Sequence, residues 1–132
     1  MEIKNDMSSI EASGLKPGSS RVDDAHRFVL AGIAPRCVRV LVELLDADPA
    51  DATAHAEAIE RVLLQAGVRL AQVHHGDGIA SWAVNRHAIT RGHGIRTGLE
   101  DTPLLPDGRV ASGNGELVAA AAAMVGQMAT RH

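Results

Sequence analysis

The chain alternates strand-like runs of β-branched residues with longer segments that carry a helical apolar stripe. The runs are expected at 8–15, 37–45, 68–75 and 94–100. The helical patterns that follow them span 20–32, 46–67, 79–92 and 116–132. Short connections between alternating strands and helices favour parallel strands joined by right-handed crossovers. The sequence therefore predicts an α/β protein of four β/α units, either an open doubly wound sheet or half of a (β/α)₈ barrel.

Local signals predict where these elements begin, end and bury their side chains. Ser20 and Asp48 are the expected N-caps, and Pro49 suits the first turn of the second helix. Glycines are expected to end the helices, at positions 32, 67 and 92. In the run 37–45, period-two alternation predicts that Val38, Val40, Val42 and Leu44 point to one face of the strand, and Cys37, Arg39, Leu41 and Glu43 to the other.

Length and composition exclude several classes of protein. The 132 residues suit a single domain, 1–132, with a weakly ordered start over 1–21 that holds the possible first strand, and a main region over 22–132. A net charge of −3 and 2% aromatic residues argue against nucleic-acid binding. No apolar run reaches the roughly 20 residues of a membrane helix, and the start has no apolar segment typical of a secretory signal. One cysteine, Cys37, in an apolar run predicts a buried structural thiol in a cytoplasmic protein.

The segment GHGIRTGLEDT, 92–102, carries the densest chemistry. Ligands of parallel α/β folds bind at the carboxyl ends of the strands, and this segment covers the last expected strand and its end. Arg96 and Glu100 fall on one face, roughly 13 Å apart along an extended strand. Glu100 and Asp101 repel each other unless a cation, a metal or a shared proton lies between them. Either they form a ligand or base site, or they are a solvated loop in which Arg96 neutralises Glu100.

Two other strand ends carry candidates. Glu43 ends the run 37–45, as a site residue or as an ordinary surface glutamate. HHGDG, 74–78, runs into a helix, where Gly76 and Gly78 allow the backbone to approach an anion. In the alternative, Asp77 only caps that helix. His74 and His75 are adjacent on a strand and point to opposite faces, so at most one enters a given site. Surface positions are expected for the other histidines, and a packing role for Trp82.

These segments, with LLPDGRVASGNGELVAAA at 104–121, resemble the beta-keto acid cleavage enzymes, whose founding activity is cleavage of 3-keto-5-aminohexanoate. The resemblance runs from about Val22 to the C-terminus and is strongest from His75 to Val118. It implies a (β/α)₈ barrel of which this chain matches the last four units. It also implies a divalent metal, usually zinc, and transfer of an acetyl group: a beta-keto acid and acetyl-CoA, or another acyl-CoA, give acetoacetate and a new CoA ester.

The resemblance also implies roles for single residues. Glu100 matches a metal ligand, Asp101 the catalytic base, and Arg96 a residue that holds the substrate or the base. Glu11 matches a substrate-contacting glutamate of an earlier strand. Apart from the resemblance, Glu43 is a substrate-binding candidate because it ends its strand. Gly76 and Gly78 are the cofactor-binding candidates because their backbone can approach a phosphate, such as that of CoA.

The chain departs from the family pattern in one respect that bears on catalysis. It contains no H-x-H pair, which supplies the family's other metal ligands. The expectation is therefore a truncated or split member that is inactive alone, and that works with a complementing half-barrel chain or as a homo-oligomer. This leaves open whether the chain by itself is an enzyme. The alternative is a non-catalytic α/β module that binds a phosphate-bearing ligand such as CoA through HHGDG.

Overall fold

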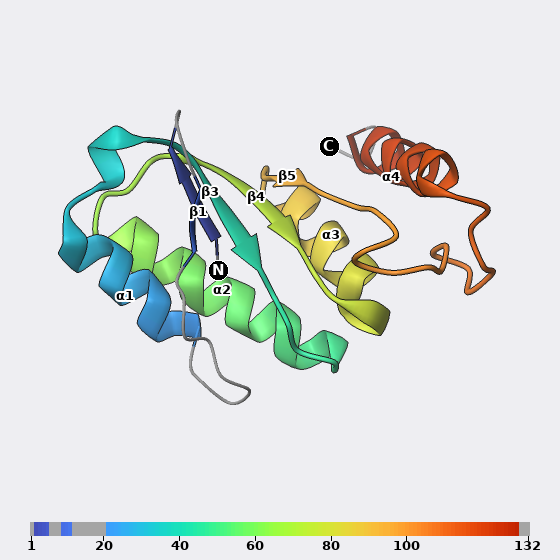
Figure 1. Ribbon diagram of the computed structural model, residues 1–132, viewed down its shortest axis with the longest axis horizontal. Coiled ribbons are helices and arrows are strands. Elements are labelled where there is room, and N and C mark those ends of the chain that lie inside the picture. Colours follow the sequence, from blue (N-terminus) through green and yellow to red (C-terminus); the bar gives the residue numbers. More distant parts are fainter. Residues whose placement is uncertain (1, 6–8, 12–20, 130–132) are drawn as a thin grey trace.

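The computed structural model describes residues 2–5, 9–11 and 21–129 (Figure 1). Ser20, the expected first N-cap, and His132 lie outside these residues. The elements in chain order are β1 (Glu2–Asn5), β2 (Ser9–Glu11), α1 (Arg21–Ala31), η1 (Ala34–Arg36), β3 (Cys37–Glu43), α2 (Pro49–Gln65), β4 (Ala71–His75), η2 (Gly78–Ala80), α3 (Ser81–Thr90), β5 (Gly94–Ile95) and α4 (Asn114–Ala129). Among the described helices, none has the length and apolar character needed to cross a membrane.

The sheet has the strand order β2-β1-β3-β4-β5 and mixes two kinds of pairing. The pairs β3–β4 and β4–β5 are parallel, as predicted. The parallel strand expected over 8–15 is wrong, because β2 pairs antiparallel with β1, and β1 pairs antiparallel with β3. Only residues 6–8 separate β1 from β2, too few for the crossover that parallel strands require. The structure is therefore α/β, with a three-stranded parallel part and an antiparallel pair at one edge.

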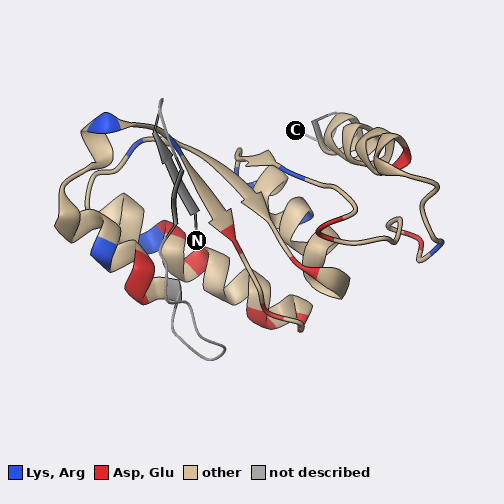
Figure 2. Cartoon of the chain, viewed as in Figure 1, with Lys and Arg blue, Asp and Glu red and all other residues tan. Residues whose placement is uncertain are grey.

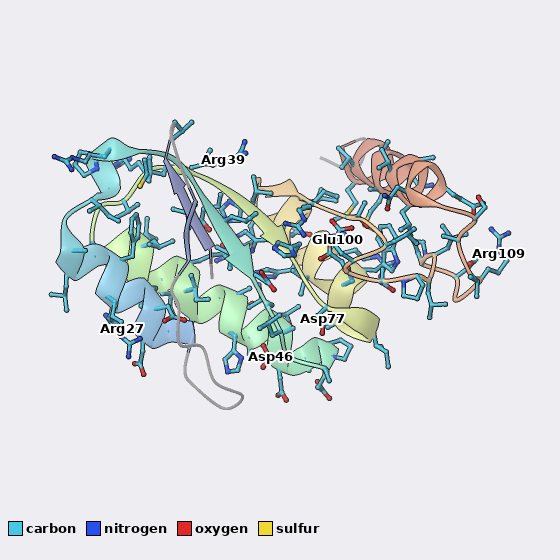
Figure 3. The ribbon with its side chains drawn as sticks, viewed as in Figure 1. Arg27, Arg39, Asp46, Asp77, Glu100 and Arg109 are labelled. Atoms are coloured by element: carbon cyan, nitrogen blue, oxygen red, sulfur yellow. The ribbon has the colours of Figure 1, made fainter. Side chains whose placement is uncertain are left out.

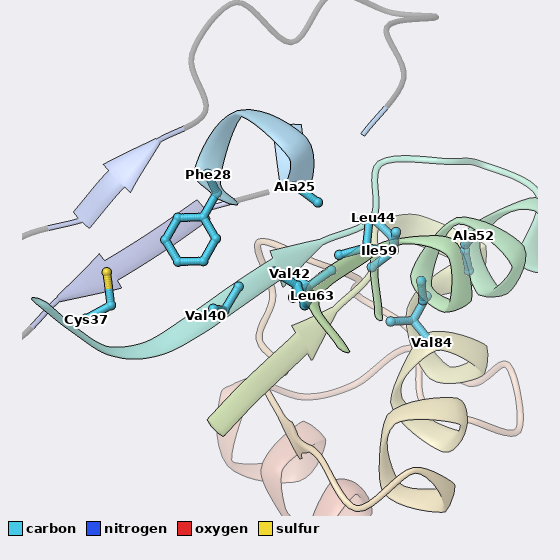
Figure 4. Packing of buried hydrophobic residues seen from close by; sticks show 12 residues of the cluster. Ala25, Phe28, Cys37, Val40, Val42, Leu44, Ala52, Ile59, Leu63 and Val84 are labelled. Atoms are coloured by element: carbon cyan, nitrogen blue, oxygen red, sulfur yellow. The ribbon is translucent and has the colours of Figure 1, made fainter. Parts of the chain in front are cut away.

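The helices contact one another in sequence order, α1 with α2, α2 with α3, and α3 with α4 (Figure 1). The main core lies between β3 and the first three helices (Figure 4). Its members include Ala25, Phe28, Val40, Val42, Ile59, Leu63 and Val84. A second cluster joins α3 to α4 around Trp82, whose ring nitrogen donates to the Leu104 carbonyl at 2.8 Å. The packing role predicted for Trp82 is confirmed.

Helix α2 begins and ends as its sequence predicts. The Asp48 side chain accepts hydrogen bonds from the backbone amides of Ala50 and Asp51, and Pro49 opens the first turn. These bonds pair amides that have no partner inside the helix. At the other end Gly67 has a φ of 74°, a conformation that L side chains rarely adopt.

One residue of β3 departs from the predicted alternation. Val38 was expected to share a face with Val40 and Val42, but it is 58% exposed, whereas Cys37, expected on the opposite face, is buried with them in the main core. Lys4 pairs with Arg39 and Asn5 with Cys37, so the register shifts at this point and Val38 is skipped. Such a β-bulge reverses the facing of the residues before it, which is why Cys37 and Val40 share a face. The buried position predicted for the Cys37 thiol is confirmed.

A buried ion cluster ties α2 to α3 and to the start of β5. Glu60, 8% exposed, accepts hydrogen bonds from His87 and His93, each at 2.8 Å, and from Arg91 at 3.2 Å. His93 stacks on His74, with ring centroids 4.7 Å apart. His87 and His93 were expected at the surface, which is wrong because Glu60 on the buried side of α2 draws them inward. The helical pattern of the sequence does not indicate that Glu60 contacts these two histidines.

The protonation of this cluster follows from its contacts. Burial acts to raise the pKa of Glu60, but the hydrogen bonds from His93, His87 and Arg91 outweigh it and lower the pKa to about 2. Burial lowers the pKa of His74 to about 4, with a further contribution from His93. The Nε2 of His74 lies 2.9 Å from the Gln72 amide oxygen. Its Nδ1 is buried and without a hydrogen-bond partner among the described residues, so a second proton has no acceptor there.

We expect the free energy of unfolding to fall as the pH drops from about 6.5 to about 4. Over that range the unfolded chain binds a proton at His74 that the folded chain excludes, so stability rises with pH. The loss is on the order of 3 kcal/mol at most. It continues as Glu60 protonates between its ordinary pKa of 4.5 and its folded value of about 2. Urea unfolding at several pH values measures this slope. His74→Gln should flatten it above pH 4.5, and the control His26→Gln, on the exposed side of α1, should not.

The packing of α3 on β4 depends on the absence of a side chain at Gly76. A Cβ there would lie 2.9 Å from Ser81 Cα and 3.0 Å from a Val84 methyl. Since backbone cannot yield as a flexible side chain does, we expect Gly76→Ala to destabilise the protein by roughly 1–3 kcal/mol. Thermal unfolding measures the change. Gly115→Ala is the control, because nothing lies within 4 Å of its Cβ position. An equal effect of both substitutions would contradict the steric explanation.

Candidate functional site

Polar side chains gather where the parallel strands end. Figure 2 shows acidic positions at the end of β3, just beyond β4 and in the loop after β5. Glu43 and His75 are paired across the β3–β4 ladder, so their side chains share one face of the sheet. The core residues Val40 and Val42 face the helices from the other side. The site is therefore at the carboxyl edge of the sheet, on the face opposite the helices.

The loop after β5 folds back instead of continuing as a strand. The strand expected over 94–100 contains only Gly94–Ile95, and the amides of Asp101 and Thr102 both donate to the Gly98 carbonyl, at 2.9 and 3.1 Å. The Glu100 carboxylate, which is the end of a flexible and exposed side chain, lies directly over Gly98, where a Cβ would displace it. In this turn Arg96 Nη2 lies 3.3 Å from Glu100 Oε1.

Asp101 is the most enclosed acid of this turn. Its side chain is 6% exposed, and its Oδ1 lies 3.1 Å from His75 Nδ1 and 3.7 Å from Arg96 Nη2. Its carbonyl accepts a 2.7 Å hydrogen bond from the Gly78 amide, which joins the turn to the segment after β4. Burial raises the pKa of the Asp101 carboxyl above its ordinary value, although His75 and Arg96 act against this. A buried carboxyl that holds its proton more tightly is suited to exchange protons with a ligand.

His75 lies between two carboxylates that come from different parts of the chain. It is 2% exposed, with Nε2 3.6 Å from Glu43 Oε2 and Nδ1 next to Asp101. His74 points to the opposite face, toward Gln72 and His93, as the alternation along β4 predicts. The sequence placed one histidine of the pair near a site but did not identify Asp101 as its partner. They are 26 positions apart in the sequence, and the segment between them carries no pattern that would reveal the contact.

Glu100 is next to Asp101 in sequence but has a different environment. Its side chain is 58% exposed and pairs with Arg96, on the loop between β5 and α4 (Figure 3). Arg96 thus lies near both carboxylates, as the cation that their repulsion requires. Within 22–128, where side chains are described, no group of three or more His, Cys, Asp or Glu could hold a metal ion. Since a catalytic zinc normally has three protein ligands, Glu100 and its neighbours do not make a complete metal site.

The remaining predicted positions have distinct outcomes. Glu11 is the last residue of β2, separated from β3 by β1, and its side chain is outside the described part. Asp77 stands before η2 without a side-chain hydrogen bond to its amides, so the predicted cap is wrong. The Gly78 amide is already bonded to the Asp101 carbonyl, and the bare Cα of Gly76 faces Ser81 and Val84. Binding of CoA at these glycines stays a prediction.

The first residue of α4 holds the turn from the other side. Asn114 Oδ1 accepts a 2.7 Å hydrogen bond from the Leu99 amide. The loop between them is closed by a bridge between Leu104 and Val110, and Leu105 packs in the cluster around Trp82. The turn that carries Glu100 and Asp101 is therefore fixed at both ends, by Gly78 and by Asn114.

Comparison with known proteins agrees with the resemblance seen in the sequence. No curated protein matches the chain. The family model of the beta-keto acid cleavage enzyme matches residues 19–131, which include all four helices and the candidate residues from Glu43 to Asp101. The activity that defines this family is the cleavage of beta-keto acids, and its enzymes depend on a metal. Because the match covers most of its length, the chain belongs to the beta-keto acid cleavage enzyme family.

Proposed function

We propose that this chain carries the base and one metal ligand for the cleavage of a beta-keto acid. Acetyl-CoA, or another acyl-CoA, donates its acyl group in this reaction, and its CoA accepts the acyl group of the substrate. A beta-keto acid and acetyl-CoA are converted to acetoacetate and a new CoA ester. The observation that carries this proposal is the buried Asp101 carboxyl, held by His75 and close to Arg96 at the carboxyl edge of parallel strands. The single cysteine, Cys37, suits a cytoplasmic setting.

In this proposal Asp101 takes a proton from the methylene carbon between the keto and carboxylate groups of the substrate. Its raised pKa brings the basicity of the carboxylate closer to what this proton transfer needs. Arg96, 36% exposed and near both acids, pairs with the substrate carboxylate or holds the base. Glu43, also partly exposed, lies near Nε2 of His75, on the other side of the ring from Asp101, and contacts the substrate together with Glu11 in this proposal.

Glu100 contributes one ligand to a divalent metal, with zinc as the proposed ion. Such a metal acts as a Lewis acid toward a carbonyl oxygen. One carboxylate does not bind zinc with useful affinity, and the chain has no H-x-H pair. The other ligands therefore come from another polypeptide segment, and the 132 residues alone turn over no substrate.

The helix arrangement supports a barrel as the setting. The main core places α1, α2 and α3 on one face of β3, each helix next to the one before it in sequence, and α3 also contacts β4. A doubly wound sheet has helices on both faces, whereas a (β/α)₈ barrel has one outer ring. We propose that β3, β4 and β5 are strands of such a barrel, completed by a complementing half-barrel chain or a second copy.

The test mixes the chain with a polypeptide that carries the H-x-H half of a family enzyme. We expect acetoacetate to form from a 3-oxo acid and acetyl-CoA only in the mixture. Asp101→Asn should keep the metal and lower kcat by about 10²- to 10⁴-fold, as expected for loss of a general base. Glu100→Gln should lower the bound zinc, measured by atomic emission.

Asp107→Asn is the matched control, an exposed acid paired with Arg109 away from the turn, and it should change neither quantity. Full activity of Asp101→Asn would contradict the role of this residue. Unchanged zinc in Glu100→Gln would contradict the ligand role. A chain that binds CoA without metal and never forms acetoacetate would instead favour a phosphate-binding module.

A further inference from the structure

The two oxygens of the Asp101 carboxyl have different surroundings. Oδ1 lies 3.1 Å from His75 Nδ1 and 3.7 Å from Arg96 Nη2. Oδ2 is buried and has no hydrogen-bond partner among the described residues. A buried carboxylate oxygen without a partner is costly, and in native proteins it calls for an explanation such as a catalytic role. The carboxyl is thus held at one oxygen and available at the other.

His75 is rigid enough to hold it. The side chain is 2% exposed, and the His75 carbonyl accepts a 2.9 Å hydrogen bond from the Leu44 amide. The next residue, Gly76, is in close contact with the start of α3. The backbone at His75 and Gly76 is therefore held in place, so the imidazole is already positioned to donate a hydrogen bond. The 3.6 Å between Nε2 and Glu43 Oε2 is longer than a hydrogen bond.

We propose that His75 is the positioning residue of Asp101, donating its Nδ1 proton to Oδ1 and so presenting Oδ2 to the substrate. An ionised carboxylate only accepts hydrogen bonds, so the proton of this contact belongs to Nδ1. The direction in which Oδ2 points is then set by a residue of β4 and not by the turn alone. The catalytic meaning of this contact rests on the proposed function, whereas the contact itself does not.

Nitrogen NMR of the 132-residue chain, labelled with ¹⁵N-histidine, tests the contact directly. Ring nitrogens with and without a proton have well-separated shifts, so the spectrum identifies the protonated nitrogen. We expect a protonated Nδ1 at the two histidines whose Nδ1 faces a carboxylate, His55 and His75, and the His75 signal is the one that disappears in His75→Asn. Asp101→Ala should shift that Nδ1 signal, and the neighbouring change Glu100→Gln should leave it in place. An unprotonated Nδ1 at His75, or an Nδ1 signal that does not shift in Asp101→Ala, would overturn the proposal.

Kinetics of the complemented enzyme then separates positioning from packing. The amide nitrogen of asparagine can replace the Nδ1 donor, whereas glutamine places its amide near the position of Nε2. We expect His75→Gln to lower kcat by about 10- to 100-fold, a cost typical of outer-shell partners, with little change in KM. His75→Asn should recover most of kcat. Equal kcat values for the two variants would contradict a role for the Nδ1 donor.

His74→Asn is the matched control, since His74 is adjacent in sequence but faces the helices. At neutral pH it should leave kcat unchanged. If the mixture with unsubstituted chain forms no acetoacetate, the proposed function fails, while the NMR result still decides whether His75 holds Asp101.

Discussion

The site depends on the burial of one carboxyl group, that of Asp101. Removing a carboxylate from water is costly unless hydrogen bonds and opposite charge replace the water. His75 and Arg96 supply these, and the Asp101 carbonyl accepts from the Gly78 amide at 2.7 Å. The turn over 98–101 is therefore attached to the end of β4 through both the side chain and the backbone of one residue. These contacts hold the polar turn against the sheet.

Two buried acids, Glu60 and Asp101, show how similar partners shift the pKa of a carboxyl group in opposite directions. Glu60 accepts three hydrogen bonds, from two histidines and an arginine, and its pKa falls to about 2. Asp101 has one hydrogen bond and a more distant arginine, and its pKa rises. The difference is the number of donors set against the cost of burial. A fully paired carboxylate is suited to hold helices together, and an underpaired one to exchange a proton. The adjacent His74 and His75 lie on opposite faces of β4, where His75 contacts Asp101 and His74 stacks on His93, a partner of Glu60.

The elements could be predicted where a local interaction determines them. Asp48 and Pro49 start α2 as predicted, and the β-branched runs give β3 and β4. Arg96, Glu100 and Asp101 could be named because they follow a strand, and the structure brings all three together. The errors arose where distant residues decide. The bulge at Val38 depends on how β1 pairs with β3, and the short β5 depends on a turn that His75 stabilises. His87 and His93 were misplaced because their partner, Glu60, is about 30 residues away.

The charge of the site has a consequence for its chemistry. Three carboxyl groups, of Glu43, Glu100 and Asp101, lie within 4 Å of either His75 or Arg96. Arg96 is the one permanent cation in these ion pairs, so the carboxyl groups outnumber it unless protons or cations compensate. Glu100 adds to the effect of burial in raising the pKa of Asp101. A further positive charge near Glu100 would lower the pKa of Asp101, against the effects of burial and of Glu100, because the attraction between opposite charges favours the ionised carboxylate. Binding of a cation at this edge of the sheet and ionisation of the proposed base are therefore expected to reinforce each other.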